Sequence, residues 1–160
     1  MNKSFNITLL SILSFLVFSV IFAFFIEYGL DHKPCRLCLY QRYPYYISLF
    51  LILIILIFKK YVKLSLIIIA IVSLIGSIIA FYHFGIEQGL FNENLVCEVK
   101  NLNSNLSKED ILKELSKVNI SCKDVTFRVF GLSLASINTV FSFILFCIFM
   151  KLFKNYEINK

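Results

Sequence analysis

Apolar positions run along this chain in four long blocks instead of alternating with polar ones. The blocks cover residues 5–26, 40–58, 64–84 and 129–150. A helix rises about 1.5 Å per residue and a bilayer core is roughly 30 Å thick, so each block is long enough, or nearly long enough, to cross a membrane. The pattern predicts an all-α membrane protein, a bundle of four transmembrane helices.

The second block is the shortest, because its continuous apolar run extends only from Pro44 to Phe58. That run covers about 22 Å, so the residues before it must help to reach the far interface. Cys38, Gln41 and Arg42 are therefore expected at the membrane boundary. The neighbouring tyrosines suit the same depth, where amphipathic rings gather: Tyr40, Tyr43, Tyr45 and Tyr46.

The connections divide between the two membrane faces. Two loops, at about 27–39 and 85–128, lie on one face, while residues 1–4, 59–63 and 151–160 lie on the other. In the longer loop, the sequence SKEDILKELSKV opens with a capping box and continues with apolar residues at helical spacing, which predicts a short amphipathic helix. We expect the 160 residues to form a single membrane domain.

Charge gives the orientation. The chain is 59% hydrophobic, against roughly 45–50% in a soluble domain, and carries a net charge of +6. The basic residues flank apolar blocks and form no basic patch with exposed aromatics, which argues against nucleic-acid binding. Lysines dominate the face with the termini, so the positive-inside rule predicts cytoplasmic termini and non-cytoplasmic loops. These lysines are Lys3, Lys59, Lys60, Lys63, Lys151, Lys154 and Lys160.

Four of the five cysteines fall in the two non-cytoplasmic loops, where disulfides persist. Cys35 and Cys38 form a C-x-x-C motif, and Cys97 and Cys122 lie in the longer loop. Cys147, in the last block, is expected to be a small buried apolar residue. Inert structural disulfides and a zinc site are alternatives, but two-residue spacing is typical of an exchangeable bond.

Cations surround the C-x-x-C motif and favour the reactive thiolate: Lys33, Arg36 and Arg42. One cysteine pair lies at headgroup depth, where a membrane-dissolved oxidant reaches it, and the other lies where a soluble protein reaches it. Exchange between the pairs would carry two electrons from a water-soluble donor to a lipid-soluble acceptor.

The stretch KPCRLCLYQRYPYY, residues 33–46, closely resembles the P-C-x-L-C-x-x-[QE]-R signature of the disulfide bond formation protein B (DsbB) family. YHFGIEQGLF at 82–91 resembles the family's exit from its third helix, and FGLSLASIN at 130–138 its entry to the fourth. The resemblance follows the whole chain in order.

The resemblance implies a bacterial inner-membrane enzyme that reoxidises the periplasmic thiol oxidase DsbA and passes the electrons to ubiquinone or menaquinone. By position, Cys97 would form the mixed disulfide with DsbA and Cys122 would be its resolving partner. Exchange with the first pair would pass through a Cys35–Cys122 bond. Cys38 would meet the quinone as a thiolate, stabilised by Arg42.

DsbA, at about −120 mV, is already a strong oxidant, so an ordinary dithiol cannot reoxidise it. An acceptor of higher potential is needed, and a quinone in the bilayer meets that need. The chain has no phosphate-cradling glycine loop and no haem-attachment motif, and neither a metal nor a flavin is expected. His83, at the end of the third block, is a candidate ligand of the quinone, and Glu87 a weaker one.

Three other kinds of membrane protein share some of these features. The order of the cysteine pairs argues against an enzyme like vitamin K epoxide reductase, in which the loop pair precedes the C-x-x-C motif. A paralogue of the DsbI type, serving a dedicated DsbA-like partner, fits the same residues. A membrane scaffold with inert disulfides predicts no thiol turnover.

Overall fold

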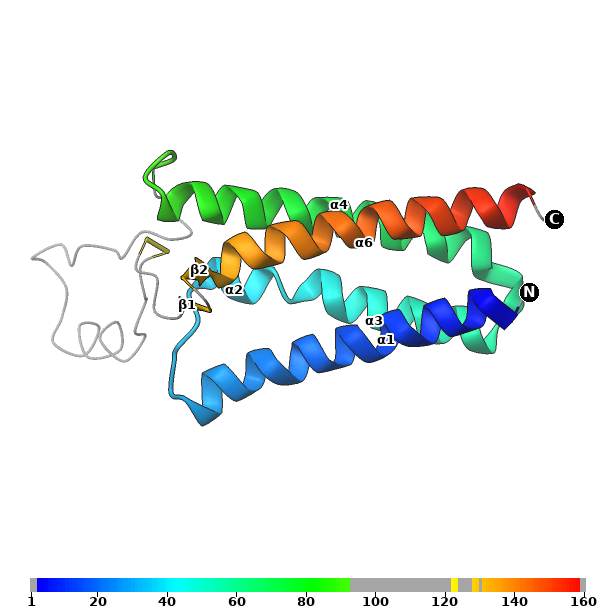
Figure 1. Ribbon diagram of the computed structural model, residues 1–160, viewed down its shortest axis with the longest axis horizontal. Helices are drawn as coiled ribbons and strands as arrows, with labels where there is room; N and C mark the ends of the chain where they lie inside the picture. The colour runs from blue at the N-terminus through cyan, green and yellow to red at the C-terminus, as the bar shows by residue number, and fades with distance from the viewer. Residues whose placement is uncertain (1–2, 93–121, 124–127, 130, 159–160) are drawn as a thin grey trace, which may run out of the picture.

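The computed structural model describes residues 3–92, 122–123, 128–129 and 131–158, and it is dominated by four long helices packed side by side (Figure 1). All four are long and apolar enough to cross a membrane. The predicted all-α bundle of four transmembrane helices is confirmed. The membrane helices are α1 (Lys3–Phe24), extended by the one-turn π-helix η1 (Phe25–Gly29), α2 with α3 (Arg36–Tyr40 and Tyr43–Ile57), α4 (Val62–Glu87) and α6 (Leu134–Ile158).

The two ends of the helix bundle carry different segments of the chain. Both termini lie at one end, together with the 3₁₀ turn η2 (Lys59–Tyr61) that joins α3 to α4 (Figure 1). An ion pair closes this end, where Lys63 Nζ lies 2.7 Å from Glu157 Oε1. The short helix α2 and the segment that leads into it from η1 lie at the opposite end. The predicted amphipathic helix of the long loop lies outside the described residues.

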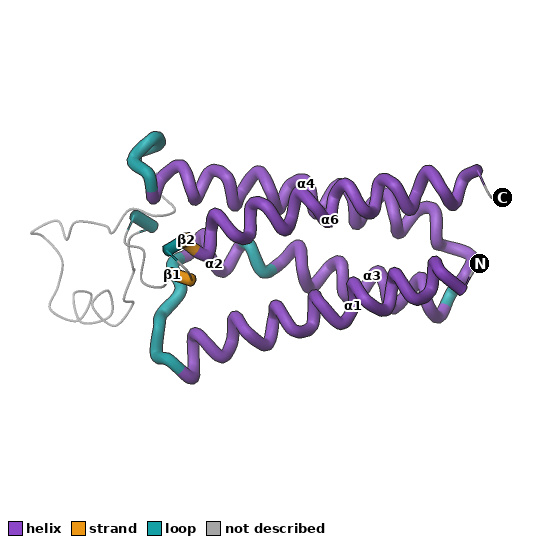
Figure 2. The backbone as a smooth tube through the Cα atoms, viewed as in Figure 1, coloured by secondary structure: helices purple, strands orange, loops and turns teal. Residues whose placement is uncertain are grey.

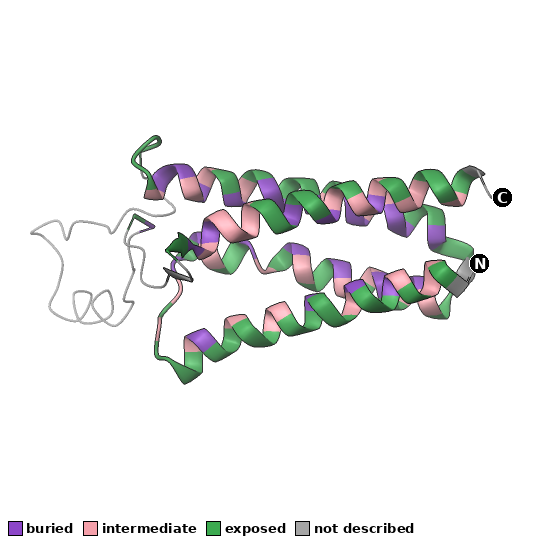
Figure 3. Ribbon diagram, in the orientation of Figure 1, coloured by how far each residue is buried: buried purple, intermediate pink, exposed green. Residues whose placement is uncertain are grey.

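Many large apolar residues are exposed, as expected of a surface that faces lipid, and Figure 3 shows exposed positions in green along all four long helices. Inside, α4 contributes small residues that bring backbones close together, since lipid offers no hydrophobic drive for helix association. Ser73, Gly76, Ser77 and Ala80 are all buried. A Cβ at Gly76 would lie 3.1 Å from the ring of Pro44, so this glycine allows α3 to approach α4.

The second membrane helix begins earlier than hydropathy indicated and is interrupted. It starts at Arg36, and a turn at residues 41–42 separates α2 from α3 (Figure 2). Pro44 explains the break, because proline has no N–H and its ring would clash with the carbonyl of Tyr40 four residues earlier. Proline at the start of α3 costs nothing, since the first N–H groups of a helix lack partners anyway. The interruption leaves the side chain of Gln41 at a joint between two helices.

The fourth membrane helix begins later than expected, at Leu134 instead of residue 129. Residues before it form a two-residue ladder of β1 (Arg128–Val129) and β2 (Leu132–Ser133), paired antiparallel. Gly131 has φ +82° at the turn, a conformation that favours glycine. Ser133 then caps the helix, because its Oγ accepts a hydrogen bond of 3.2 Å from the N–H of Ser136.

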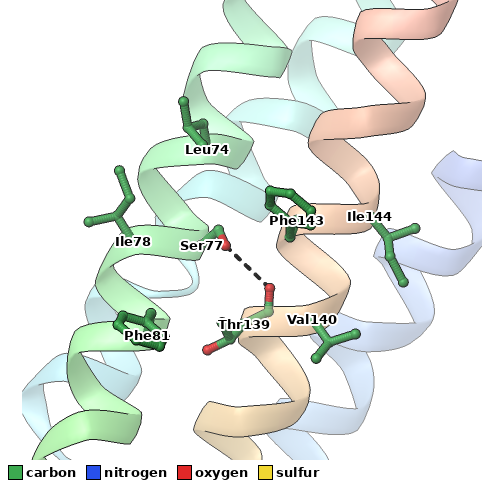
Figure 4. Close-up of a pocket in the computed structure, with 8 residues that line it drawn as sticks. All are labelled: Leu74, Ser77, Ile78, Phe81, Thr139, Val140, Phe143 and Ile144. Carbon is green, nitrogen blue, oxygen red and sulfur yellow. Dashed lines mark hydrogen bonds between the residues drawn. The ribbon is translucent and has the colours of Figure 1, made fainter.

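A shallow groove runs between α4 and α6, as Figure 4 shows. The Ser77 hydroxyl donates to the carbonyl of Thr139 at its floor, over 3.3 Å. Its other lining side chains are almost all apolar: Leu74, Ile78, Phe81, Val140, Phe143 and Ile144. The groove is thus part of the apolar surface of the bundle and shares no residue with the cysteine site.

Candidate thiol-disulfide exchange site

Cys35 and Cys38 lie together at the start of α2. Cys35 is the N-cap residue, and its Sγ accepts a hydrogen bond of 3.3 Å from the backbone N–H of Cys38. The two sulfurs are 3.0 Å apart and both residues are free thiols. A disulfide needs an S–S distance of about 2.05 Å, so a small side-chain movement suffices to join them. The pair is therefore in its reduced state, and its sulfurs lie close enough to form a disulfide on oxidation.

The surroundings of Cys35 favour its thiolate. The pKa of Cys35 is lowered well below its usual range, mainly by the hydrogen bond from Cys38. Burial opposes this shift, while the His83 imidazole adds a hydrogen bond and, in its protonated form, a favourable charge interaction. The Nε2 atom of His83 lies 3.5 Å from Cys35 Sγ. Because the thiolate is the attacking species, Cys35 is the more nucleophilic sulfur in this state.

Cys122 reaches the same place from the long loop. It is buried and disulfide-bonded, and its Sγ, the Sγ of Cys35 and a ring nitrogen of His83 all lie within 4.8 Å of one another. Cys35, Leu37, Ile86 and Cys122 form one buried cluster. The other predicted member of the second pair, Cys97, lies outside the described residues. Two cysteines that are 87 positions apart are thus neighbours.

A line of hydrogen bonds leads from His83 across the bundle. The Gln41 Nε2 atom lies 2.9 Å from His83 Nδ1, and Asn138 Nδ2 donates to Gln41 Oε1 over 2.7 Å. The hydroxyls of Tyr45 and Ser142 both donate to Asn138 Oδ1. The line joins α3, α4 and α6 through the joint between α2 and α3, where Gln41 sits. A polar group at this depth is costly without a partner, and each of these has one.

Arg42 faces the end of α1. Its Nη1 forms an ion pair with Glu27 Oε2, and its guanidinium lies 5.2 Å from the centre of the Phe24 ring. Glu27 sits in the π-helical turn η1, which places its carboxylate beside the second membrane helix. Both charged side chains are mostly buried, so the pair fixes α1 to the cysteine end of the bundle.

Sequence reasoning placed Gln41 at the membrane boundary but gave it no role, and it missed Glu27 and Asn138. The available signal was the presence of polar residues at the ends of apolar blocks, which are rare and usually satisfied within the bundle. The expectation for Cys147 was wrong, because this residue is exposed on the outer face of α6. In a bilayer an apolar thiol gains nothing by leaving lipid for the interior, so hydropathy does not predict which face it takes.

The clustered donors also bear on metal binding. Cys35, His83 and Cys122 would offer two sulfurs and one nitrogen, but the sulfur of Cys122 is part of a disulfide and is not a thiolate ligand in this state. Structural zinc needs four ligands with deprotonated thiols. Sulfur exchange, not metal binding, is the chemistry that this arrangement favours.

A reduced C-x-x-C pair beside a buried, disulfide-bonded cysteine, at one end of four membrane helices, defines a membrane-embedded thiol–disulfide oxidoreductase. Comparison with known proteins agrees. The family model "Disulfide bond formation protein DsbB" matches residues 5–152, and the chain belongs to this family. It is also 30% identical, over 118 residues, to the uncharacterized protein RP370 of Rickettsia prowazekii (strain Madrid E), covering 72% of this chain and 69% of that one. No solved structure matches the chain.

Proposed function

We propose that this protein reoxidises a periplasmic DsbA-like thiol oxidase and passes the electrons to a membrane quinone, ubiquinone or menaquinone. Its activity would support disulfide formation in exported proteins. The observation that carries the proposal is the position of Cys122, whose sulfur lies within 4.8 Å of the Cys35 sulfur. A relay between two cysteine pairs requires such a meeting point.

The exchange reactions conserve electrons at each step. A thiolate of the partner attacks Cys97 in the Cys97–Cys122 disulfide, and Cys122 leaves as a thiolate. Cys122 then attacks Cys35 in the oxidised C-x-x-C pair, so that the Cys35–Cys122 bond forms and Cys38 leaves as a thiolate. The partner's second thiol displaces Cys97, which releases the oxidised partner. Two electrons have then moved from the partner to the chain.

The residues around Cys38 fit a quinone headgroup. Cys38 is only half-buried, and Leu39, Tyr40 and Tyr43 beside it are exposed on the lipid side of the bundle. Arg42, the next candidate ligand, is held one helical turn further on by Glu27. When bound, the quinone supplies a two-electron acceptor. The chain supplies a thiolate at Cys38, an apolar approach from lipid and a nearby cation.

His83 is the third candidate for contact with the quinone. In this structure its ring is buried, with one nitrogen facing Cys35 and the other facing Gln41, while Glu87 Oε1 lies 3.6 Å from Nε2. Direct contact between a quinone carbonyl and the imidazole would therefore require His83 to give up one of these partners.

The membrane orientation belongs to the same proposal. The excess of lysine at the end with the termini favours a cytoplasmic location for that end, by the positive-inside rule. The cysteine end then faces the periplasm of a bacterial inner membrane. The partner thus meets the relay from water, and the quinone meets it from the bilayer.

Purified protein, a reduced DsbA-type thiol oxidase and a soluble ubiquinone analogue test the proposal together. We expect partner oxidation and quinone reduction at equal rates. Thiol labelling measures the first, and the absorbance of the quinone measures the second. Cys38→Ser should abolish quinone reduction, and Cys97→Ser should abolish partner oxidation. Cys147→Ser, at the exposed free thiol, is the matched control and should keep full activity.

Wild-type protein that oxidises no partner and reduces no quinone above background would refute the enzyme and favour a scaffold with inert disulfides. Activity with one DsbA-like protein and none with a general DsbA would identify a dedicated, DsbI-type pair. Quinone reduction by Cys38→Ser would remove the role proposed for that sulfur.

A further inference from the structure

The hydrogen bonds behind His83 have a defined direction. A hydroxyl readily donates to an amide oxygen, and Asn138 Oδ1 receives two, from Tyr45 and Ser142. The amide nitrogen of Asn138 therefore points to Gln41 and donates to its Oε1. With its oxygen occupied in this way, Gln41 presents its nitrogen to His83. Each amide fixes the orientation of the next.

The direction of these hydrogen bonds determines which ring nitrogen of His83 carries the proton. An amide N–H from Gln41 needs an acceptor, so Nδ1 of His83 carries a lone pair and its proton is on Nε2. Nε2 is the atom that lies 3.5 Å from Cys35 Sγ. We propose that Gln41 and Asn138 are positioning residues, which hold His83 in the tautomer that donates its Nε2–H to the Cys35 sulfur.

The N–H of His83 would act at the release of Cys35 during disulfide exchange. The inference therefore rests on the proposed function. When the Cys97 thiolate attacks Cys122 in the Cys35–Cys122 bond, the Cys97–Cys122 bond forms. Cys35 leaves with the electron pair as a thiolate. The sulfur is then buried, 6% exposed, and a preset N–H donor stabilises its charge without a proton transfer.

The surroundings leave few other groups to perform this task. Among the described residues, the titratable groups that face the Cys35 sulfur are Cys38 and His83, with the Cys122 sulfur nearby, and the Glu87 carboxylate lies 3.6 Å from the same Nε2 atom of His83. Cys38 cannot serve as a donor during the release of Cys35, because it is itself deprotonated and committed to the quinone at that stage. His83 is thus the side chain that supplies an N–H to this sulfur, beside the backbone N–H of Cys38.

The tautomer can be measured directly in the wild-type chain. The sequence has two histidines, so ¹⁵N-histidine labelling of the full-length protein in detergent gives two ring spectra, which His32→Gln separates. We expect His83 to show a protonated Nε2 and an unprotonated Nδ1. Protonation of Nδ1, with or without Nε2, would overturn the proposal. The measurement needs no partner and no quinone, so its failure is distinct from failure of the proposed activity.

Shape-matched variants test the two positioning residues. Gln41→Met removes the donor to Nδ1, and Asn138→Leu removes the group that orients Gln41. In both we expect mixed His83 tautomers and slower alkylation of reduced Cys35 at pH 5, just above its folded pKa of about 4, by about two- to tenfold for a rise of about one to two units in the thiol pKa. Thr139→Val is the control, since within the described part of the chain that hydroxyl bonds to the Ala135 carbonyl of its own helix and to no other group.

A conservative variant completes the test. In Gln41→Glu one carboxylate oxygen still accepts from Asn138 and the other accepts from Nδ1–H, so both ring nitrogens become protonated and Nε2 still donates. Rapid alkylation of Cys35 should therefore return. Gln41→Met or Asn138→Leu with a wild-type tautomer and a wild-type pH profile would refute the positioning role, and equal slowing by Thr139→Val would reduce it to general packing.

Discussion

The contact between Cys35 and Cys122 predicts a disulfide that can be trapped in isolation. A chain with Cys38→Ala, Cys97→Ala and Cys147→Ser retains only these two cysteines. A sulfur confined within 4.8 Å of another is at a local concentration of about 4 M, far above the micromolar concentration of the protein. Mild oxidation with diamide should therefore give a quantitative intramolecular bond, about six orders of magnitude faster than dimers form.

The same bond should stabilise the fold. It closes a loop of about 90 residues, and the chain-entropy relation gives an upper value of about 4–5 kcal/mol for such a closure. Thermal unfolding in detergent should shift upward on oxidation and return on reduction. Peptide mapping by mass spectrometry identifies the bond, and non-reducing electrophoresis separates it from dimers.

A matched variant makes this prediction specific. Replacing Cys35 instead of Cys38 leaves Cys38 and Cys122, and among the described residues Cys38 is not part of the group that lies within 4.8 Å. This variant should cross-link more slowly. Equal rates in the two variants would show that Cys122 has no preference for Cys35 over Cys38. Dimers alone in the first variant would show that Cys122 does not lie beside Cys35 and would remove the basis of the relay.

Other changes have defined outcomes. His83→Asn should raise the pKa of Cys35 by about 1–2 units from about 4, the value of one hydrogen bond to a charge, so its alkylation at pH 5 slows by about two- to tenfold while that at pH 9 does not. Because this pKa is depressed by folding, the reduced protein should lose stability as pH falls from 8.5 toward the folded pKa, and less so in the variant. Glu27→Gln leaves Arg42 charged and mostly buried without its ion pair, and should lower the free energy of unfolding by about 1–3 kcal/mol; an unchanged denaturation midpoint would contradict this. Gly85→Ala puts a Cβ 2.2 Å from the aromatic ring six residues later, and calorimetry should show a loss of about 1–2 kcal/mol in the free energy of unfolding; an unchanged value would show that the ring moves aside freely.

Hydropathy and local chemistry determined much of this protein in advance. Apolar runs of about 15–22 residues can only be satisfied in lipid as helices, so the four membrane helices follow from composition and length, the second with help from the residues before its short run. The spacing of Cys35 and Cys38, and the residues that follow them, were sufficient for the family resemblance. Proline at position 44 even contains the reason for the break between α2 and α3, although the break itself was not predicted.

Only the tertiary structure decided which polar groups meet. Asn138 bonds to Gln41 across 97 positions, Glu27 pairs with Arg42 from another helix, and Cys122 lies beside Cys35. Helical periodicity gives the face of one helix but not its rotation against its neighbours, and in lipid no hydrophobic drive reveals which face turns inward. Cys147, expected inside and found outside, shows the same limit. Packing of small residues and satisfaction of a few buried polar groups set those rotations, and they bring the parts of the site together.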